Sequence, residues 1–336
     1  MEGWCPVEDL VRWAFAHAPV VMANEAHNGL ARCVRTREVG VRMVRAAHEA
    51  GVRRLAMEAL PHRRGEPQGP ILAIPPDREG YLTQPDMQRL IGAALDLGWT
   101  LWAYEAVIDI TPDTDQEHLR SMEFTNWRER EQAANLGRLV DAAPGEPLLV
   151  WCGNGHATKE ECEEWIPMGW HFREMHGVDP FVIDQTVTVD FSGEPWPWVR
   201  ELLESLAGTL AAYGGTAGIL RDQAPPPLDF YTGVDALVVS TDNEMTASSS
   251  GCWSPTGARS RSASWPRRPC SASRRWRSTP PTMPPAGTSA GPTRRSSCRA
   301  PVRRLTSTWT RSSPRPPGRA ATCCTRGTAS CPSGPN

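Results

Sequence analysis

Residues 148–156 read LLVWCGNGH, and this stretch decides the fold class. Its first five residues are apolar, a run short enough for one buried strand, and the small-residue turn GNG that follows delivers His156 at the strand end. Residues 19–27, PVVMANEAH, repeat this design near the N-terminus, with His27 in the corresponding place. Two apolar strands that each end in a turn and a histidine predict that both histidines lie at one edge of a sheet.

The other apolar runs alternate with amphipathic stretches that are long enough for helices. Strands separated by helices of about 10 to 20 residues favour an α/β fold, with a mostly parallel sheet and helices on both faces. The predicted strands are 19–23, 54–59, 100–105, 148–152, 181–184 and 236–240. The predicted helices are 7–16, 30–50, 85–97, 127–143 and 197–212. Because ligands of such sheets bind beyond the carboxyl ends of the strands, the strand ends hold the candidate site residues.

The chain of 336 residues changes character near residue 245. Residues 246–336 hold 16 Arg, 14 of the 32 Pro and no Asp, Glu or Lys, whereas residues 1–245 hold 38 acidic against 20 basic residues. The second segment lacks apolar periodicity, so it cannot bury enough surface to offset its chain entropy. We predict one α/β domain over 1–245 and a disordered basic tail, rich in Ser, Pro and Arg, over 246–336. Such a tail is either a genuine interaction arm or the product of a frameshift in a GC-rich gene.

Composition and missing motifs exclude several classes of function. An acidic domain lacks the clustered Lys and Arg that nucleic-acid phosphates require, so no nucleic-acid partner is expected. No run of 18 apolar residues occurs, and residues 1–10 lack a basic segment followed by an apolar one, so we expect a cytoplasmic protein with no membrane partner. Phosphate-binding glycine loops and the nucleophile elbow are absent as motifs. The expected partner is a small-molecule substrate, and no sequence signal indicates an oligomeric state.

Carboxylates join the two histidines at the predicted sheet edge. Glu25 lies two residues before His27, Glu58 ends the apolar strand LAME, and Glu105 ends TLWAYE. Clustered imidazoles and carboxylates shift each other's pKa values, which suits general acid–base catalysis or the binding of a divalent metal ion. A carboxylate inside an apolar strand is costly unless it is paired or used, which favours a functional role for Glu58. A helix cap or a salt bridge would explain Glu105 equally well.

Two arginines supply positive charge near these groups. Helical spacing places Arg37 within the apolar stripe of the predicted helix 30–50, where its guanidinium needs carboxylates, for which Glu25 and Glu58 are candidates. Arg37 is therefore either a structural ion pair beneath the site or a clamp for a substrate anion. Arg128 lies near the start of the helix 127–143 and can reach the same edge, whereas Arg130 is expected to face solvent.

Two further features have a structural explanation that we prefer. Cys152 ends a buried strand and is expected to be a small core residue rather than a nucleophile. The Trp-rich stretch 165–176 could stack on a flat ligand, but a hydrophobic lid or the edge of the core explains it better.

Taken together, these motifs resemble the superfamily of erythromycin esterases, ChaN-type haem-uptake proteins and Tiki/TraB proteins. The resemblance rests on NEAH at 24–27, the helix that bears Arg37, the strand that ends in Glu58, REREQAANL from Arg128, and GNGH at 153–156. It spans roughly residues 10–245. It implies an α/β fold of two related halves with a cleft between them. It also implies catalytic or ligand roles for Glu25, His27, Glu58 and His156.

The resemblance leaves two functional hypotheses of different classes, and a third possibility is a degenerate, inactive member whose truncated or shifted end has cost it stability. The first is a hydrolase in which His27 or His156 activates water for attack on an ester or amide, with Glu25 and Glu58 tuning the base. A divalent metal ion held by Glu25, His27, Glu58 and His156 is a variant of this hypothesis, and the candidate substrate-binding residues are Arg37, Asn154, Glu105 and Arg128. The second hypothesis is a protein that binds haem or another planar ligand, with His156, His171 or Tyr104 near the iron.

Overall fold

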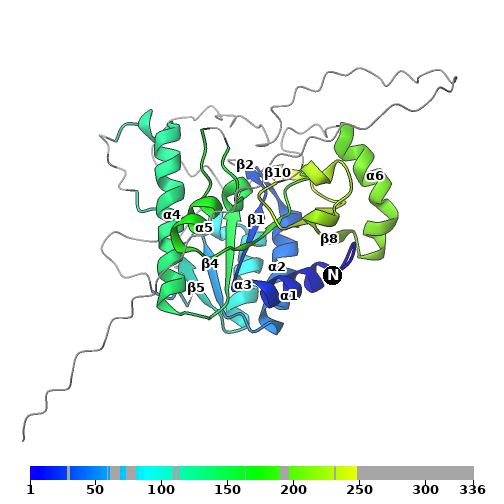
Figure 1. Cartoon of the computed structure of the whole chain (residues 1–336), viewed down its shortest axis with the longest axis horizontal. Coiled ribbons are helices and arrows are strands. Elements are labelled where there is room, and N and C mark those ends of the chain that lie inside the picture. The colour runs from blue at the N-terminus through cyan, green and yellow to red at the C-terminus, as the bar shows by residue number, and fades with distance from the viewer. Residues whose placement is uncertain are drawn as a thin grey trace, which may run out of the picture. The chain divides into compact units, whose positions relative to one another are not determined.

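The computed structural model describes residues 1–28, 31–58, 60, 69–72, 81–108, 111, 114–162, 164–189, 197–230 and 232–247. These residues form an α/β fold on a seven-stranded sheet with the strand order β5-β4-β6-β1-β7-β9-β8 (Figure 1). Every neighbouring pair is parallel except β8 with β9. The predicted fold class is confirmed, while the two related halves remain a prediction. The predicted tail falls outside the described residues after Ala247.

The elements follow the predicted alternation of strands and helices. The strands of the large sheet are β1 (Val20–Glu25), β4 (Arg54–Met57), β5 (Thr100–Ala103), β6 (Leu148–Gly153), β7 (Phe181–Asp184), β8 (Thr216–Leu220) and β9 (Ala236–Ser240). The α-helices are α1 (Val7–His17), α2 (Val34–Glu49), α3 (Pro85–Asp96), α4 (Met122–Ala142), α5 (Met168–His176) and α6 (Pro197–Ala212). Short 3-10 turns include η1 (Tyr81–Thr83) and η3 (Asn154–Ala157).

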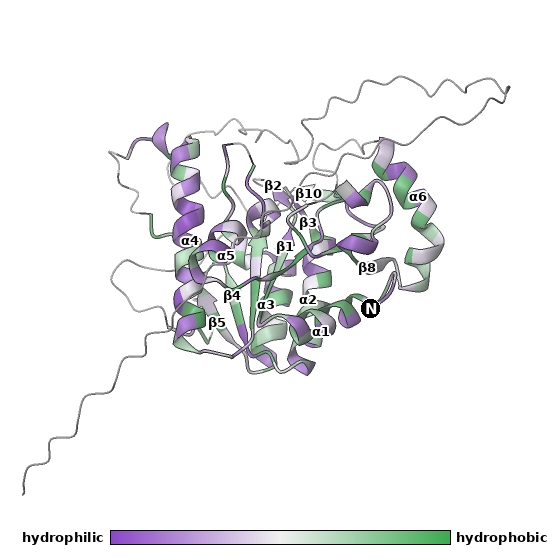
Figure 2. Cartoon of the chain, in the orientation of Figure 1, coloured by the Kyte–Doolittle hydropathy of each residue, from purple (hydrophilic) through white to green (hydrophobic). Residues whose placement is uncertain are grey.

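Alternate residues of each central strand enter two different cores, as expected for a sheet covered on both faces. Val21 and Ala23 of β1 pack with α1, α2 and α3, whereas Val20 and Met22 pack with α4 and α5. Beside the β8–β9 edge, α6 closes a third cluster. Figure 2 shows hydrophobic colour in the central strands and hydrophilic colour along much of α4. Among the described helices, none combines the length and the apolar composition that crossing a bilayer requires.

The chain leaves β1 and β6 toward opposite faces, which marks where a ligand site is expected. After β1 the chain continues into α2 on one face, and after β6 it continues into α5 on the other. The two strands are parallel neighbours, with Glu25 opposite Gly153 at their carboxyl ends. Ligands of open α/β sheets bind at such a switch point.

A small second sheet carries His27. It contains β2 (His27–Asn28), β3 (Ala31–Cys33) and β10 (Met245–Ala247) in the order β10-β3-β2, and both pairs are antiparallel. Arg32 lies between His27 on one side and Thr246 on the other. The strand β10 continues two residues past the predicted domain boundary at 245.

Several predicted boundaries were wrong for identifiable reasons. Helix α2 begins at Val34 instead of Leu30, because residues 31–33 pair as β3. Helix α4 begins at Met122, five residues earlier than predicted, and Ser121 caps it by accepting a hydrogen bond from Phe124 N (3.1 Å). The strand β8 and the helix α5 were not predicted from the sequence. The strand β8 reads TAGIL, whose Gly and Ala weaken the strand pattern, and polar residues interrupt the helical periodicity of α5.

Candidate active site

The carboxyl edge of the sheet gathers the predicted residues. Glu25 is the last residue of β1, Glu58 directly follows β4, and Glu105 lies two residues beyond β5. His27 begins β2, and His156 lies in η3 after β6. All five therefore lie at the ends of four strands that are neighbours in the sheet.

His27 is held by a fully buried carboxylate. Its Nδ1 donates to Glu25 Oε1 at 3.0 Å, because an ionised carboxylate only accepts hydrogen bonds. Glu25 has no exposed surface and also accepts hydrogen bonds from Trp151 Nε1 (3.1 Å) and from the Tyr81 hydroxyl. Burial raises the pKa of Glu25, but the charge of Arg37 and the hydrogen bonds from His27 and Arg37 outweigh burial and lower it. Glu25 is therefore an anion that fixes the proton of His27 on Nδ1.

Arg37 occupies the buried position that helical spacing predicted. Its Nε and Nη2 donate to Glu25 Oε2 (2.7 Å) and Oε1 (3.1 Å), and its Nη1 donates to Asp86 Oδ2 (2.9 Å) and Gln84 Oε1 (2.5 Å). Its side chain is 1% exposed. Glu25 is its partner as predicted, but Asp86 takes the place expected for Glu58. This geometry favours the structural ion pair over the substrate clamp, because the buried guanidinium is engaged on three nitrogens.

His156 has an equivalent buried partner that the sequence analysis missed. Its Nδ1 donates to Glu129 Oε1 at 2.5 Å, and Glu129 on α4 is fully buried. Glu129 also accepts hydrogen bonds from Met168 N (2.7 Å) and Trp165 Nε1 (3.2 Å). Burial lowers the pKa of His156, but Glu129 and Glu58 outweigh burial and raise the pKa to about 9. His156 is therefore an imidazolium at neutral pH.

Glu58 lies between the two histidines and Arg128. Its Oε1 is 4.0 Å from His156 Nε2 and accepts a hydrogen bond from Arg128 Nη2, while its Oε2 accepts one from Gly153 N (3.0 Å). Burial raises the pKa of Glu58, but the charges of His156, Arg128 and His27 together lower it far below its ordinary value. Glu58 is an anion that orients its cationic neighbours, and so low a pKa makes it a weak base.

Arg128 reaches the edge as predicted and bridges two strand ends. Its Nε donates to Glu105 Oε1 at 2.9 Å, and its Nη2 contacts both Glu105 and Glu58. Gln132 Nε2 supports Glu105 Oε1 at 3.0 Å. Glu105 therefore forms the salt bridge that was one of its two structural explanations. Arg130 is exposed and Cys152 is buried in the core, as predicted.

Gly153 allows His27 to approach β6 closely. A Cβ atom at position 153 would lie 2.2 Å from Cε1 of His27 and 2.9 Å from its Nε2. The imidazole of His27 therefore lies over the same residue whose N–H binds Glu58. A continuous set of contacts joins His27, Gly153, Glu58 and His156.

The residues proposed for a metal ion do not fit one. Within the described ranges, no group of three or more His, Cys, Asp or Glu side chains is arranged to hold a metal ion. The reason lies in the partners of the two carboxylates. The oxygens of Glu25 accept from Arg37, Tyr81, Trp151 and His27, and the guanidinium of Arg128 lies against Glu58, where a cation would otherwise bind.

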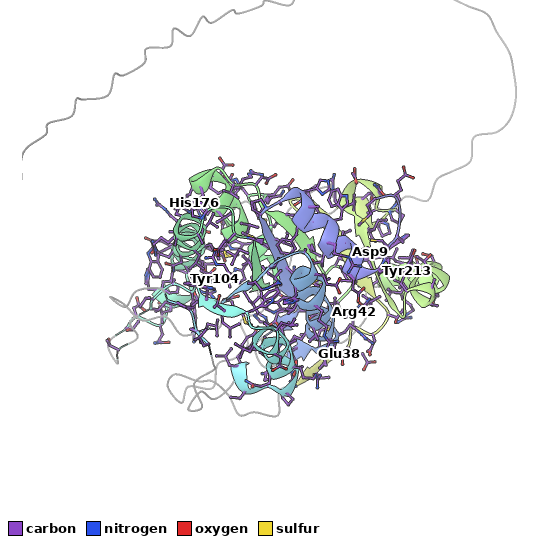
Figure 3. The ribbon with its side chains drawn as sticks, turned by 90° about the horizontal axis from the view of Figure 1, so that it is seen from below. Asp9, Glu38, Arg42, Tyr104, His176 and Tyr213 are labelled. Atoms are coloured by element: carbon purple, nitrogen blue, oxygen red, sulfur yellow. The ribbon has the colours of Figure 1, made fainter. Side chains whose placement is uncertain are left out.

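The residues proposed as haem ligands do not fit that role either. Tyr104, labelled in Figure 3, is fully buried. Its hydroxyl donates to the Trp151 carbonyl at 3.0 Å. His156 has its Nδ1 2.5 Å from Glu129 Oε1 and its Nε2 4.0 Å from Glu58 Oε1, so both ring nitrogens face carboxylates. His171 lies in α5, which packs against α4, and its Nε2 is buried. These three side chains therefore do not form a set of axial ligands.

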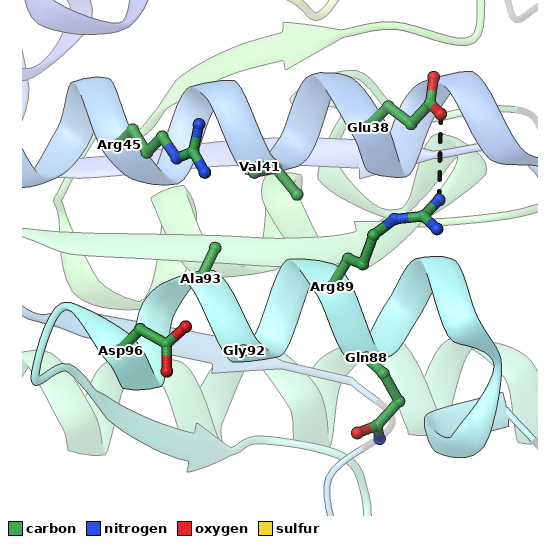
Figure 4. Close-up of a pocket in the computed structure, with 8 residues that line it drawn as sticks. All are labelled: Glu38, Val41, Arg45, Gln88, Arg89, Gly92, Ala93 and Asp96. Atoms are coloured by element: carbon green, nitrogen blue, oxygen red, sulfur yellow. Dashed lines mark ion pairs between the residues drawn. The ribbon is translucent and has the colours of Figure 1, made fainter.

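A separate groove of about 540 Å³ lies between α2 and α3 (Figure 4). Arg45 and Glu38 of α2 and Arg89 and Asp96 of α3 line it, and Glu38 and Arg89 are 3.9 Å apart. None of the site residues described above lines this groove. It is therefore distinct from the histidine site.

Glu129, Tyr81 and Trp151 complete the site and were missed by the sequence analysis. A signal for Glu129 did exist, because it precedes Gln132, Ala133 and Leu136 at helical spacing on the buried face of α4. For Tyr81, which reaches Glu25 from η1, the sequence holds no such signal. Trp151 was assigned to the strand, but its indole N–H was not linked to Glu25.

Comparisons with known proteins leave the family open. No family model and no curated protein matches the chain. One similar solved structure is the type III effector HopBA1, with 16% identity over 56% of this chain and 85% of that one, and a TM-score of 0.33. Another is a Bacillus cereus protein, with 10% identity over 71% of this chain and 100% of that one, and a TM-score of 0.35. A mutant of erythromycin esterase EreC in its open conformation matches with 16% identity over 47% of this chain and 46% of that one, and a TM-score of 0.26. TM-scores this low do not establish a relationship, and membership of the superfamily remains a prediction.

Proposed function

We propose that the protein is a hydrolase that cleaves an ester or amide bond by attack of water. The observation that carries the proposal is the pair of histidines at neighbouring strand ends, each with Nδ1 on a fully buried carboxylate. A carboxylate on Nδ1 fixes the orientation of the ring and leaves Nε2 for chemistry, as in other histidine-based active sites. The two rings differ in their surroundings, and this difference suggests different roles.

His27 is the general base of the proposal. Its Nδ1 carries the proton that Glu25 accepts, so Nε2 presents a lone pair when the ring is neutral. The side chain is 29% exposed, which gives water access to the ring. In the proposed step, Nε2 removes a proton from water while the water oxygen attacks the carbonyl carbon.

His156 is the general acid. A pKa of about 9 keeps it protonated at neutral pH, and its side chain is 18% exposed. Its Nε2–H can stabilise the negative charge that develops on the substrate oxygen and then protonate the leaving alkoxide or amine. Glu58 supports this role because its negative charge stabilises the protonated ring of His156, while its own low pKa means that it does not take the proton from His156.

Arg128 is a candidate for substrate contact. Its side chain is 24% exposed at the same edge, with Glu58 and Glu105 fixing its position. Since both carboxylates offset its charge, we expect it to bind a neutral hydrogen-bond acceptor, such as a carbonyl oxygen, rather than a strongly anionic group. This role fits esters and amides.

The test is a hydrolysis screen of the full chain against nitrophenyl esters, lactones and fluorogenic amides. His27→Ala and His156→Ala should each lower kcat/KM by at least about 100-fold, the contribution expected of general acid–base catalysis. His27→Ala should change Tm little, because Arg37 still pairs with Glu25, whereas His156→Ala should also lower Tm, because it removes the protonated partner of the buried Glu129. His17→Ala is the matched control, because His17 is exposed near the opposite edge of the sheet. Wild-type rates in both site variants would contradict the proposal, as would an equal loss in His17→Ala.

A further inference from the structure

Asn154 lies where β6 leaves the sheet. The pairing of β1 with β6 ends at Glu25 opposite Gly153, and the chain then turns into η3. The backbone of β6 can no longer pair with β1 beyond this point, although His27 is only two residues further along. Some other group must therefore fix the backbone of His27 relative to the segment that carries His156.

The side chain of Asn154 makes that connection. Its Nδ2 donates to the His27 carbonyl at 3.0 Å, and its Oδ1 accepts from His27 N at 3.4 Å. The side-chain amide of Asn154 thus donates one hydrogen bond to the backbone of His27 and accepts one from it, as the backbone of a neighbouring strand would. His156 follows Asn154 by two residues in the same 3-10 turn. One side chain therefore connects the elements that carry the two histidines.

The backbone of Asn154 supports a specific role for this residue. Its φ is 28°, and among the described residues it is the only non-glycine with a positive φ. Asparagine tolerates this region better than most residues, but glycine adopts it more easily. A residue other than glycine at a strained backbone position indicates that its side chain makes a contact that offsets the strain.

Asn154 is also tied to the opposite half of the sheet. Its carbonyl accepts a hydrogen bond from Asn24 Nδ2 at 2.6 Å, and the same Nδ2 contacts Asp184 Oδ1 at 3.0 Å at the end of β7. Asn24 Oδ1 accepts from Gln185 N at 2.9 Å. The polar connection therefore runs from β7 through Asn24 and Asn154 to His27.

We propose that Asn154 is a positioning residue that sets the place of His27 relative to His156, and not a residue that contacts substrate. The expected effect of Asn154 on catalysis rests on the hydrolase function proposed above. The claim that Asn154 sets the position of His27 does not depend on that function. Without the amide, the backbone of His27 keeps its pairing with Arg32 of β3 but loses its link to the segment that carries His156, so its Nδ1 should leave the optimum distance from Glu25. His156, held by Glu129, should be unaffected.

The experiment is nitrogen NMR of the full chain labelled with ¹⁵N-histidine, because it reads the tautomer of each ring without a substrate. Spectra of His27→Gln and His156→Gln assign the signals. In the wild type, His27 should show a proton on Nδ1 and a bare Nε2 when neutral. In Asn154→Gly, which keeps the backbone conformation available, this pattern should change to a mixture of both tautomers, while His156 still titrates at about 9. The Tm should stay within a few degrees of the wild type.

Two further variants make the outcome decisive. Asn154→Asp keeps the acceptor but places an oxygen against the His27 carbonyl, so it should disturb His27 at least as much as Asn154→Gly. Asn126→Ala is the matched control, since Asn126 also bridges a loop backbone, donating to Glu164 O (2.7 Å) and accepting from Ile166 N (2.9 Å). It should leave His27 unchanged. An unaltered tautomer of His27 in both Asn154 variants would overturn the proposal, and so would loss of folding in both.

The same spectra test the positioning role of Asn154 independently of the proposed hydrolase function. If the chain hydrolyses no ester or amide but His27 responds to Asn154→Gly, the positioning role stands and the proposed function fails. If hydrolysis is observed, Asn154→Gly should lower kcat at least tenfold with KM little changed, because a misplaced base slows the chemical step rather than binding. A selective rise in KM would instead assign Asn154 to the substrate and overturn the proposal.

Discussion

Replacing Glu129 by glutamine should convert His156 from a cation to a neutral ring at neutral pH. In the native protein, burial lowers the pKa of His156, whereas Glu129 and Glu58 raise it from 6.5 to about 9. That difference corresponds to roughly 3 kcal/mol in favour of the imidazolium. Glu129 is the nearer carboxylate, with Oε1 2.5 Å from Nδ1, against 4.0 Å between Nε2 and Glu58. We therefore expect the pKa of His156 in the variant to fall to about 7 or below.

This change should also alter how stability depends on pH. The pKa of His156 in the folded state lies above its unfolded value of 6.5, so its protonation stabilises the fold fully below pH 6.5. The contribution is lost as the pH rises through about 9. Over this window the wild type should lose up to roughly 3 kcal/mol of unfolding free energy from His156, and Glu129→Gln should lose much less.

Two assays check the prediction. NMR titration of His156 gives its pKa directly, and urea denaturation at pH 6.5 and pH 9 gives the difference in unfolding free energy. Glu123→Gln, an exposed glutamate in the first turn of the same helix, is the control and should behave as the wild type. The reasoning is refuted if His156 titrates at about 9 in Glu129→Gln, or near 6.5 in the wild type.

Two other predictions concern packing around the site. Gly153→Ala would place a Cβ 2.2 Å from Cε1 of His27, so it should displace the ring and lower kcat/KM by roughly 100-fold. The control is Gly208→Ala in α6, where a Cβ meets nothing within 4 Å and activity should not change. Equal activity in both variants would contradict the placement of His27. Arg37→Leu removes the partner of the buried Glu25 and Asp86, so chemical denaturation should show a loss of about 3–5 kcal/mol. A loss below about 1 kcal/mol would mean that Arg37 does not stabilise these carboxylates in the way its contacts indicate.

The sequence predicted the large sheet well, because its central strands are apolar runs between helices of sufficient length. It failed at β8 and at the three short strands around His27. The strand β10 exists through pairing between segments far apart in the chain, Thr246 with Arg32, which no local periodicity encodes. The strands β2 and β3 pair with each other locally, but with two and three residues they are too short to show a strand periodicity.

At the site, the strand-end rule located both histidines and the three glutamates, and helical spacing indicated that Arg37 and Arg128 are near them, but Glu129, the carboxylate that binds His156, was not predicted. Glu129 lies among the charges of RERE. Helical spacing places it on the buried face of α4, but only the packing of α4 against residues 165–168 and His156 shows which groups its carboxylate binds. Of the two carboxylates that bind Arg37, Glu25 was predicted and Asp86 was not. Asp86 comes from α3, and its approach depends on how α2 and α3 pack rather than on spacing within either helix.

The measurement that most directly tests the account is the pH dependence of kcat/KM for the best substrate in the hydrolysis screen. If His156 is the general acid, kcat/KM should fall as the pH rises through about 9, and this limb should move to lower pH in Glu129→Gln. His27→Ala should remove most of the activity at every pH. A rate that keeps rising with pH beyond 9, or an alkaline limb that Glu129→Gln leaves in place, would contradict the assignment of His156 as the acid.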